Sequence, residues 1–166
     1  MNIRRRTEED TITATEPSFA SLALAGQPPP DWADVVIVPL PQGAHGGPRC
    51  WAERLFDGSD LPKPVLALMG LRQFLVRLVG IGPAPSTVFD VAAVVGDEAL
   101  IVELEDHLDF RCGVGVDHEA GLLRVTTAVW LHGWRGRLYF APVSVLHDPI
   151  TRAMMRRAVR RAGGST

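Results

Sequence analysis

The chain has 166 residues, 46% hydrophobic and 22% charged, a composition typical of one globular domain with a sizeable core. Its formal net charge of -2 offers no overall attraction for nucleic acid or acidic lipid. The longest apolar runs are interrupted before they reach membrane-spanning length, and the basic N-terminus lacks the apolar core of a signal peptide. We therefore expect a cytoplasmic protein without a transmembrane segment or a nucleic-acid partner.

Cysteine and histidine positions give no sign of a metal or cofactor. Cys50 and Cys112 are far apart and lack CxxC spacing, which favours two buried free thiols over a disulfide. His45 and His118 fall in predicted loops without partners at metal-ligand spacing. No Gly-rich loop has the P-loop or Rossmann form, so the sequence predicts no cofactor.

The first part of the chain is predicted to lie outside the folded domain. Residues 1–30 are expected to form a disordered or loosely packed tail that ends in three prolines. Its PSFASLALAG segment contains apolar residues that can pack against the folded domain. A single domain is expected over residues 31–162, with 163–166 disordered. Its first element is a short strand, DVVIVPL, and Pro39 indicates either a sheet edge or the end of the strand.

Two helices are predicted next, followed by a change to strand periodicity. Residues 51–56 have helical spacing, and residues 66–82 form a longer apolar helix that contains Arg72 and Phe74. Residues 87–95 then read as a buried strand. In residues 100–105 we expect Leu100, Val102 and Leu104 to be buried and the alternate residues to be exposed to solvent.

The last third of the chain is the stretch on which the fold prediction depends. Leu108, Phe110 and Cys112 mark one face of a strand, and alternate residues from Leu123 to Leu131 mark another. Around Gly133 to Gly136 we expect a hairpin turn, with Leu138 and Phe140 in the last strand. Asp148 and Pro149 have the form of a helix start, and the final helix is expected to end at Gly163.

This order predicts an α+β fold in which a curved antiparallel sheet wraps around a long C-terminal helix. The tracts DWADVVIVPLPQG, LALMGLRQFLVRLVGI, EDHLDFRCGVGV, VTTAVWLHGWRGRLYFAPV and ITRAMMRRA follow one another in an order that resembles the family catalogued as domain of unknown function 2867. That family, common in actinobacteria, is grouped with the START and Bet v 1-like (SRPBCC, helix-grip) superfamily. The resemblance covers roughly residues 31–162.

The resemblance implies a helix-grip fold and a cavity between sheet and helix. START-like relatives bind lipids, sterols, polyketides or other apolar molecules there, and some cyclise or hydrate them. The family has no accepted catalytic motif, so no catalytic residue is carried over. Pro142 departs from the expected pattern, because it cannot donate to a strand ladder and suggests that the last strand ends there.

Three sets of polar or aromatic residues are candidates for a site. His107, Asp109 and Arg111 share one strand face and are suited to holding an anionic or polar group, or else join Glu103, Glu105 and Arg124 in an exposed charge ladder. Aromatic and histidine side chains surround the expected hairpin tip, where they either line a cavity mouth or close the core: Trp130, His132, Trp134 and Tyr139. Arg72 is either a buried anchor or an arginine that reaches water.

We draw three hypotheses from these residues. The favoured one is a non-catalytic module that binds a small apolar molecule, with Arg72 or Arg111 as polar anchor and a lining of Phe74, Phe110, Trp130, Tyr139 and Met154. The second is a polyketide cyclase or dehydratase type enzyme, in which His107 with Asp109, or Tyr139 with His132, transfers protons. The third is an interaction domain that joins a protein partner through a C-terminal arginine stripe of Arg152, Arg156, Arg157, Arg160 and Arg161.

Overall fold

The computed structural model describes residues 20–57 and 90–163. Residues 1–19 of the predicted tail and the predicted helix at 66–82, with Arg72 and Phe74, lie outside the described residues. Within the two described ranges, no helix is long and apolar enough to cross a membrane.

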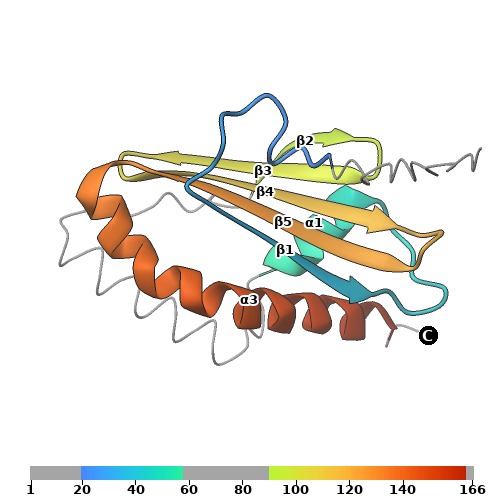
Figure 1. The fold of residues 1–166 in the computed structure, drawn as a ribbon. Helices are drawn as coiled ribbons and strands as arrows, with labels where there is room; N and C mark the ends of the chain where they lie inside the picture. Colours follow the sequence, from blue (N-terminus) through green and yellow to red (C-terminus); the bar gives the residue numbers. More distant parts are fainter. Residues whose placement is uncertain (1–19, 58–89, 164–166) are drawn as a thin grey trace, which may run out of the picture.

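Five antiparallel strands form one sheet, and a long C-terminal helix lies along one side of it (Figure 1). The strands are β1 (Trp32–Pro39), β2 (Val91–Val95), β3 (Glu98–Glu105), β4 (Leu108–Asp117) and β5 (Leu122–Leu131). Their spatial order is β1-β5-β4-β3-β2. The predicted α+β class, with a curved antiparallel sheet against a long C-terminal helix, is therefore confirmed.

β5 lies inside the sheet because it pairs with β4 on one side and with β1 on the other. β1 ends the strand order, as Pro39 predicts, since proline lacks the N–H that an interior strand needs. The predicted faces of β4 and β5 are also confirmed. The side that faces the helix, called the inner face below, carries the alternate apolar residues Leu108, Phe110, Cys112, Leu123, Val125 and Val129.

Two strand predictions at the other end of the sheet were wrong. β2 is not a buried strand, because Val94 and Val95 are 40% and 61% exposed at the edge. In β3 only Leu100 is buried as predicted: Ile101 is fully buried on the inner face, whereas Leu104 is 73% exposed on the opposite, outer face. The acidic residues of β3 misled the assignment, since Glu103 and Glu105 share the inner face with Ile101.

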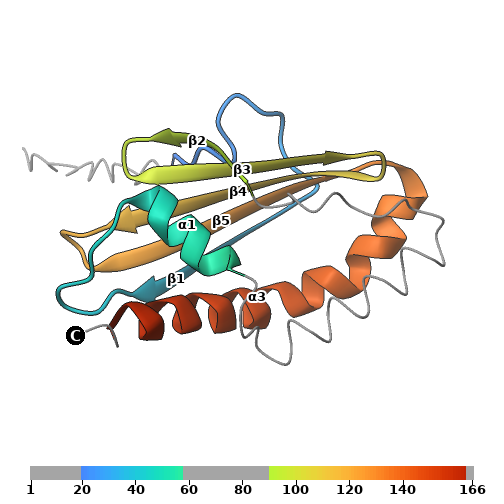
Figure 2. The same ribbon diagram turned by 180° about the vertical axis from the view of Figure 1, so that it is seen from behind.

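The two described helices are α1 (Pro48–Phe56) and α3 (Gly133–Gly163), and both pack on the inner face (Figure 2). α1 confirms the short helix predicted around Trp51. α3 contradicts the predicted hairpin, because residues 136–140 are its first turns and not a strand. A hairpin partner for β5 has no free edge to join, since β1 already occupies that side.

The predicted helix start at Asp148 and Pro149 was also wrong. α3 runs through Pro142 and Pro149, and Asp148 pairs with Arg152 one turn later at 2.9 Å. A proline inside a helix removes one backbone hydrogen bond and bends the axis. The first part of α3 accordingly curves away from the straighter second part in Figure 1.

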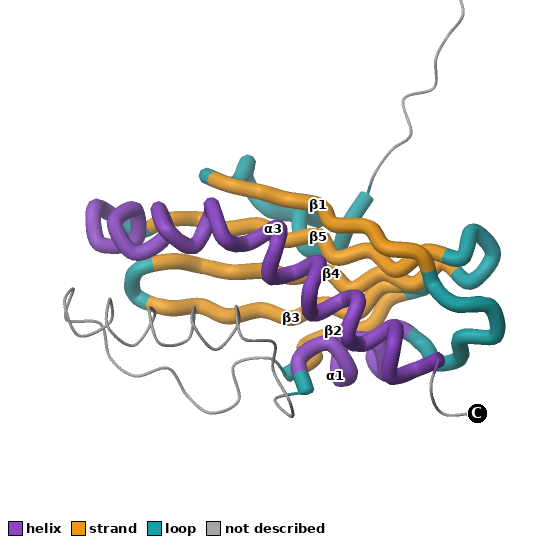
Figure 3. Tube along the Cα trace, turned by 90° about the horizontal axis from the view of Figure 1, so that it is seen from below, coloured by secondary structure: helices purple, strands orange, loops and turns teal. Residues whose placement is uncertain are grey.

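Two apolar clusters fill the inner face. Figure 3 shows the helices α1 and α3 that pack on this face. The larger cluster joins the sheet to α1 and to the second half of α3, with Trp51, Leu55 and Met155 almost fully buried. The smaller one joins β4 and β5 to the first half of α3. This second cluster contains Leu108, Val129, Tyr139 and Phe140.

Residues 20–31 cross the outer face of the sheet and are held there by buried polar contacts. The Ser21 hydroxyl and the Leu22 N–H donate to the Glu98 carboxylate at 2.7 and 2.8 Å. Arg111 donates to the Leu22 carbonyl at 3.0 Å, and Ala23 is fully buried. This part of the chain is therefore packed against the sheet.

Candidate functional site

Aromatic side chains pack between the first half of α3 and the inner face. Trp32 packs edge-on against Phe140 with ring centroids 5.1 Å apart, and Phe110 contacts the same cluster. Of the predicted lining residues, Phe110 and Tyr139 thus meet in this cluster. Met154 lies farther along α3 and packs against the larger core. Tyr139 and Phe140 are only 9% and 5% exposed, so their rings form a packed apolar wall beneath α3.

A histidine–carboxylate pair borders this cluster on the β1 side. His147 of α3 places Nδ1 3.2 Å from Oδ2 of Asp34 in β1, and its ring packs edge-on against Trp32 at 4.8 Å. Thr151, one turn later, places Oγ1 3.5 Å from Nε2 of the same ring. The order carboxylate, imidazole, hydroxyl resembles a proton-transfer relay.

The protonation state of His147 follows from its surroundings. Burial lowers its pKa below the ordinary histidine value, whereas the hydrogen bond and the negative charge of Asp34 act in the opposite direction. The ring is therefore neutral at pH 7. A neutral imidazole oriented by a carboxylate can accept a proton or a hydrogen bond.

A second histidine–carboxylate pair borders the cluster on the β3–β4 side. His107 lies in the turn between these strands and is only 4% exposed, with Nδ1 3.3 Å from Oε2 of Glu105. Its ring packs edge-on against Tyr139 at 4.9 Å. Gly136 permits this approach of α3, because a Cβ at that position would collide with the His107 carbonyl oxygen.

The predicted trio of His107, Asp109 and Arg111 does not form one face. Asp109 and Arg111 lie on the outer face, while His107 is directed toward α3. The alternative charge ladder was wrong as well, because Glu103 and Glu105 are on the inner face and Arg124 is on the outer face. The β3–β4 turn separates these residues because the strand alternation is broken at His107.

The residues predicted around a hairpin tip are also distributed over both sides. Trp130 is on the outer face and donates from its indole N–H to the Pro28 carbonyl at 3.1 Å. His132 is exposed and places Nε2 3.1 Å from Asp109, and Trp134 is 67% exposed. Tyr139 alone of this group reaches the inner face. Trp130 and Arg111 therefore do not border the space beneath α3.

Cys112 lies on the inner face beside this region, in the larger core. Burial raises the pKa of its thiol to about 12, although a hydrogen bond with Thr127 favours the thiolate. Cys50 and Cys112 are both free thiols. Among the residues that the structure describes, no three or more His, Cys, Asp or Glu side chains gather as metal ligands.

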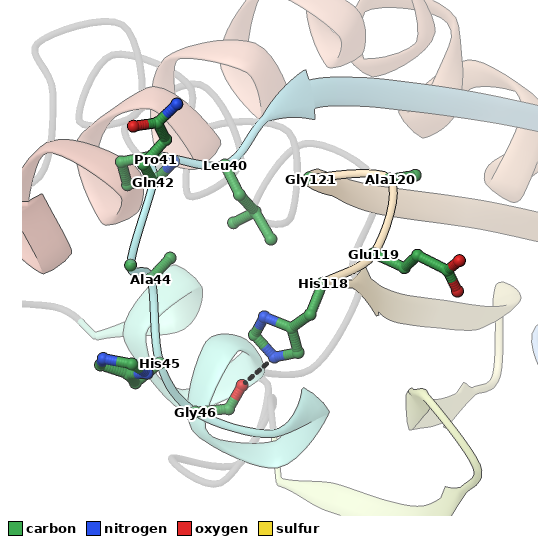
Figure 4. Close-up of a pocket in the computed structure, with 11 residues that line it drawn as sticks. Leu40, Pro41, Gln42, Ala44, His45, Gly46, His118, Glu119, Ala120 and Gly121 are labelled. Carbon is green, nitrogen blue, oxygen red and sulfur yellow. Dashed lines mark hydrogen bonds between the residues drawn. The ribbon is translucent and has the colours of Figure 1, made fainter.

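An open pocket of about 510 Å³ lies at the other end of the sheet, between the β1–α1 loop and the β4–β5 turn (Figure 4). Its lining includes both loop histidines, His45 and His118. The His118 ring lies 3.0 Å from the Gly46 carbonyl oxygen, whereas the His45 and Glu119 side chains point away from the centre. The pocket is polar and open to solvent, whereas the aromatic residues beneath α3 pack against one another.

Sequence reasoning missed Asp34, His147 and Thr151. Asp34 sits among apolar residues at an inner-face position of β1, and His147 and Thr151 have the four-residue spacing of one helix face. Those two signals are visible in the sequence. The pairing between β1 and α3 is not, since 113 positions separate the two residues.

The chain was compared with curated proteins, solved structures and protein-family models. No curated protein and no solved structure matches the chain. One family model matches, described as "Protein of unknown function (DUF2867)", and the match spans residues 27–154. These residues include all five strands, both described helices except the last turns of α3, and both histidine–carboxylate pairs. Because the match covers more than half of the chain, this protein belongs to the DUF2867 family.

Proposed function

We propose that the chain is a START or Bet v 1-like protein of the cytoplasm that binds a small apolar, lipid- or polyketide-like molecule between the inner face and α3. The observation that carries this proposal is the aromatic cluster beneath α3 with a histidine–carboxylate pair at each border. Polar groups at the rim of an apolar surface are typical of small-molecule sites, where they orient a ligand that apolar contacts hold.

Of the two arginines that the sequence suggested as polar anchor, Arg72 lies outside the described residues and stays a prediction, and Arg111 is replaced in this proposal. Arg111 donates to Leu22 on the outer face, so it does not face a ligand beneath α3. His147 and His107 stand on the inner side and provide nitrogen atoms for a hydroxyl or carbonyl group. Phe110, Tyr139 and Met154 remain the proposed lining residues.

The first test is native mass spectrometry of the protein purified from its own host, followed by organic extraction. A retained small molecule of apolar type is the expected result. The inner-face variant Phe110→Leu should retain less of it, whereas the outer-face control Trp130→Phe should retain as much as wild type. A protein mass without added molecules, together with no thermal shift across a panel of lipids and polyketides, contradicts the proposal.

A second candidate function is a cyclase or dehydratase type reaction on such a molecule. What favours it is the buried contact of His107 with Tyr139, beside Glu105. A histidine that acts as general acid or base on a bound molecule contributes a factor of about 100 to 10,000 in rate. His107→Gln should therefore lower turnover of the extracted molecule by about 100-fold or more. Unchanged turnover in that variant would remove His107 from the reaction.

A further inference from the structure

The first half of α3 exposes an apolar row on the side away from the sheet. Trp134, Leu138 and Val145 are 67%, 48% and 76% exposed, and we call these three residues the apolar stripe. At about 100° per residue they fall within about 40° of one another around the helix axis. The buried residues of the same turns, such as Gly136 and Phe140, lie on the opposite side. Exposed apolar rows of this kind mark interaction surfaces.

The charges beside the apolar stripe are positive. Arg135 and Arg137 are both exposed and flank the stripe, and α3 has no acidic residue before Asp148. The Arg135 guanidinium lies 5.8 Å from the centre of the Trp134 ring. Beyond the bend, the second half of α3 also carries the exposed arginines Arg156 and Arg160.

Other charges on and near α3 are engaged within the molecule. Arg152 is held by Asp148, and Arg161 is held by Asp57. Asp109, at the sheet end next to the start of α3, is held by His132. The first half of α3 therefore presents the apolar stripe with arginines on both flanks, and the second half presents two exposed arginines.

We propose that α3 docks this protein reversibly on an anionic lipid bilayer, with the apolar stripe at the level of the headgroups. A bilayer accepts a protruding row of side chains without a complementary groove, and tryptophan favours its interface. Arg135 and Arg137 face the anionic headgroups in this orientation. The first half of α3 lies in the plane of the surface and does not cross it. This inference is independent of the proposed small-molecule ligand.

The test is co-sedimentation of the full chain with vesicles made of equal parts phosphatidylcholine and phosphatidylserine. Wild type should sediment with these vesicles and not with pure phosphatidylcholine. The triple variant Trp134→Ser, Leu138→Ser and Val145→Ser should lose binding. A matched control replaces three exposed apolar residues of the sheet, Val94→Ser, Val95→Ser and Leu104→Ser, and should bind like wild type.

A charge variant separates the electrostatic contribution. Arg135→Gln with Arg137→Gln should weaken binding to the mixed vesicles by about tenfold or more, because each basic residue near an anionic surface contributes about 1 kcal/mol. Wild type that stays in the supernatant with the mixed vesicles overturns the proposal. Equal binding by the stripe variant and the sheet control overturns it too. A wild-type dimer that the stripe variant dissociates would assign the stripe to a second copy of the chain instead.

Discussion

His147 and Asp34 come from elements 113 positions apart, and their contact makes the stability of the molecule depend on pH. Because burial lowers the pKa of His147 in the folded chain, the unfolded chain binds a proton more readily at mildly acidic pH. The free energy of unfolding must therefore decrease as the pH falls from the ordinary histidine value of 6.5 toward the lowered value. Above 6.5 this contribution is constant.

We expect His147→Gln to remove this pH dependence, because glutamine does not titrate. The measurement is urea unfolding of wild type and variant at pH 7 and pH 5. Wild type should lose more stability than the variant between the two values. Asp34→Asn should lower the pKa of His147 further, since it removes the negative charge that favours the protonated ring. Equal losses in wild type and His147→Gln would mean that this histidine titrates as it does in the unfolded chain.

At the scale of elements, the start of α3 depends on one close approach. Gly136 lies against the backbone of the β3–β4 turn, and any Cβ there would collide with the His107 carbonyl oxygen. A backbone atom cannot rotate aside as a side chain can. The whole first half of α3, with Tyr139 and Phe140, must therefore shift if this residue gains a methyl group.

Gly136→Ala should lower the free energy of unfolding by about 1–3 kcal/mol, the usual cost of overpacking, even though alanine favours helices. Chemical denaturation measures this change. Gly163→Ala is the control, since no atom lies within 4 Å of a Cβ there and it also belongs to α3. Stabilisation by Gly136→Ala would mean that the helix start is not seated on the turn.

The elements also show which parts of the fold the sequence predicts. In β4 and β5 the alternating residues predict the inner face correctly, because both strands are buried along most of their length. β3 fails this rule, since its inner face carries Glu103 and Glu105 while Leu104 faces solvent. The predicted hairpin failed for a non-local reason: residues 136–140 have strand-like composition, but β1 occupies the edge that they would join.

The candidate site was less predictable than the sheet. Phe110 and Tyr139 were identified because aromatic residues on apolar faces are prominent in the sequence. The polar residues at the border, His147 with Asp34 and His107 with Glu105, depend on how α3 crosses the sheet. The way in which α3 crosses the sheet cannot be predicted from a short stretch of sequence.

On the scale of the whole molecule, the sheet is covered on both sides. Part of the outer face is covered by residues 20–31, whose Ser21 and Leu22 bind the buried Glu98 carboxylate. Gly113 makes room for this contact, because a Cβ there would collide with the Glu98 carboxylate. The N-terminal segment and the strands are thus one packed unit, which continues through the sheet to α1 and α3.

Gly113→Ala should displace the N-terminal segment and lower the free energy of unfolding by about 1–3 kcal/mol. The change in the segment is measured by proteolysis of the folded chain, where cleavage within residues 20–31 should become faster. Gly163→Ala again serves as the control, and its cleavage rate should equal that of wild type. Unchanged proteolysis in Gly113→Ala would show that Glu98 moves aside at little cost.

The position of β1 beside β5 also sets an order in time during synthesis. β1 is complete at Pro39, but its only strand partner in the described sheet ends at Leu131, about 90 residues later. At ribosomal rates this delay is roughly 5 to 20 s. Throughout that interval β1, with its continuous apolar run from Val35 to Val38, has no β5 to pair with and can join a strand of another chain. Native pairing of β1 therefore begins only when about four fifths of the polypeptide has been made.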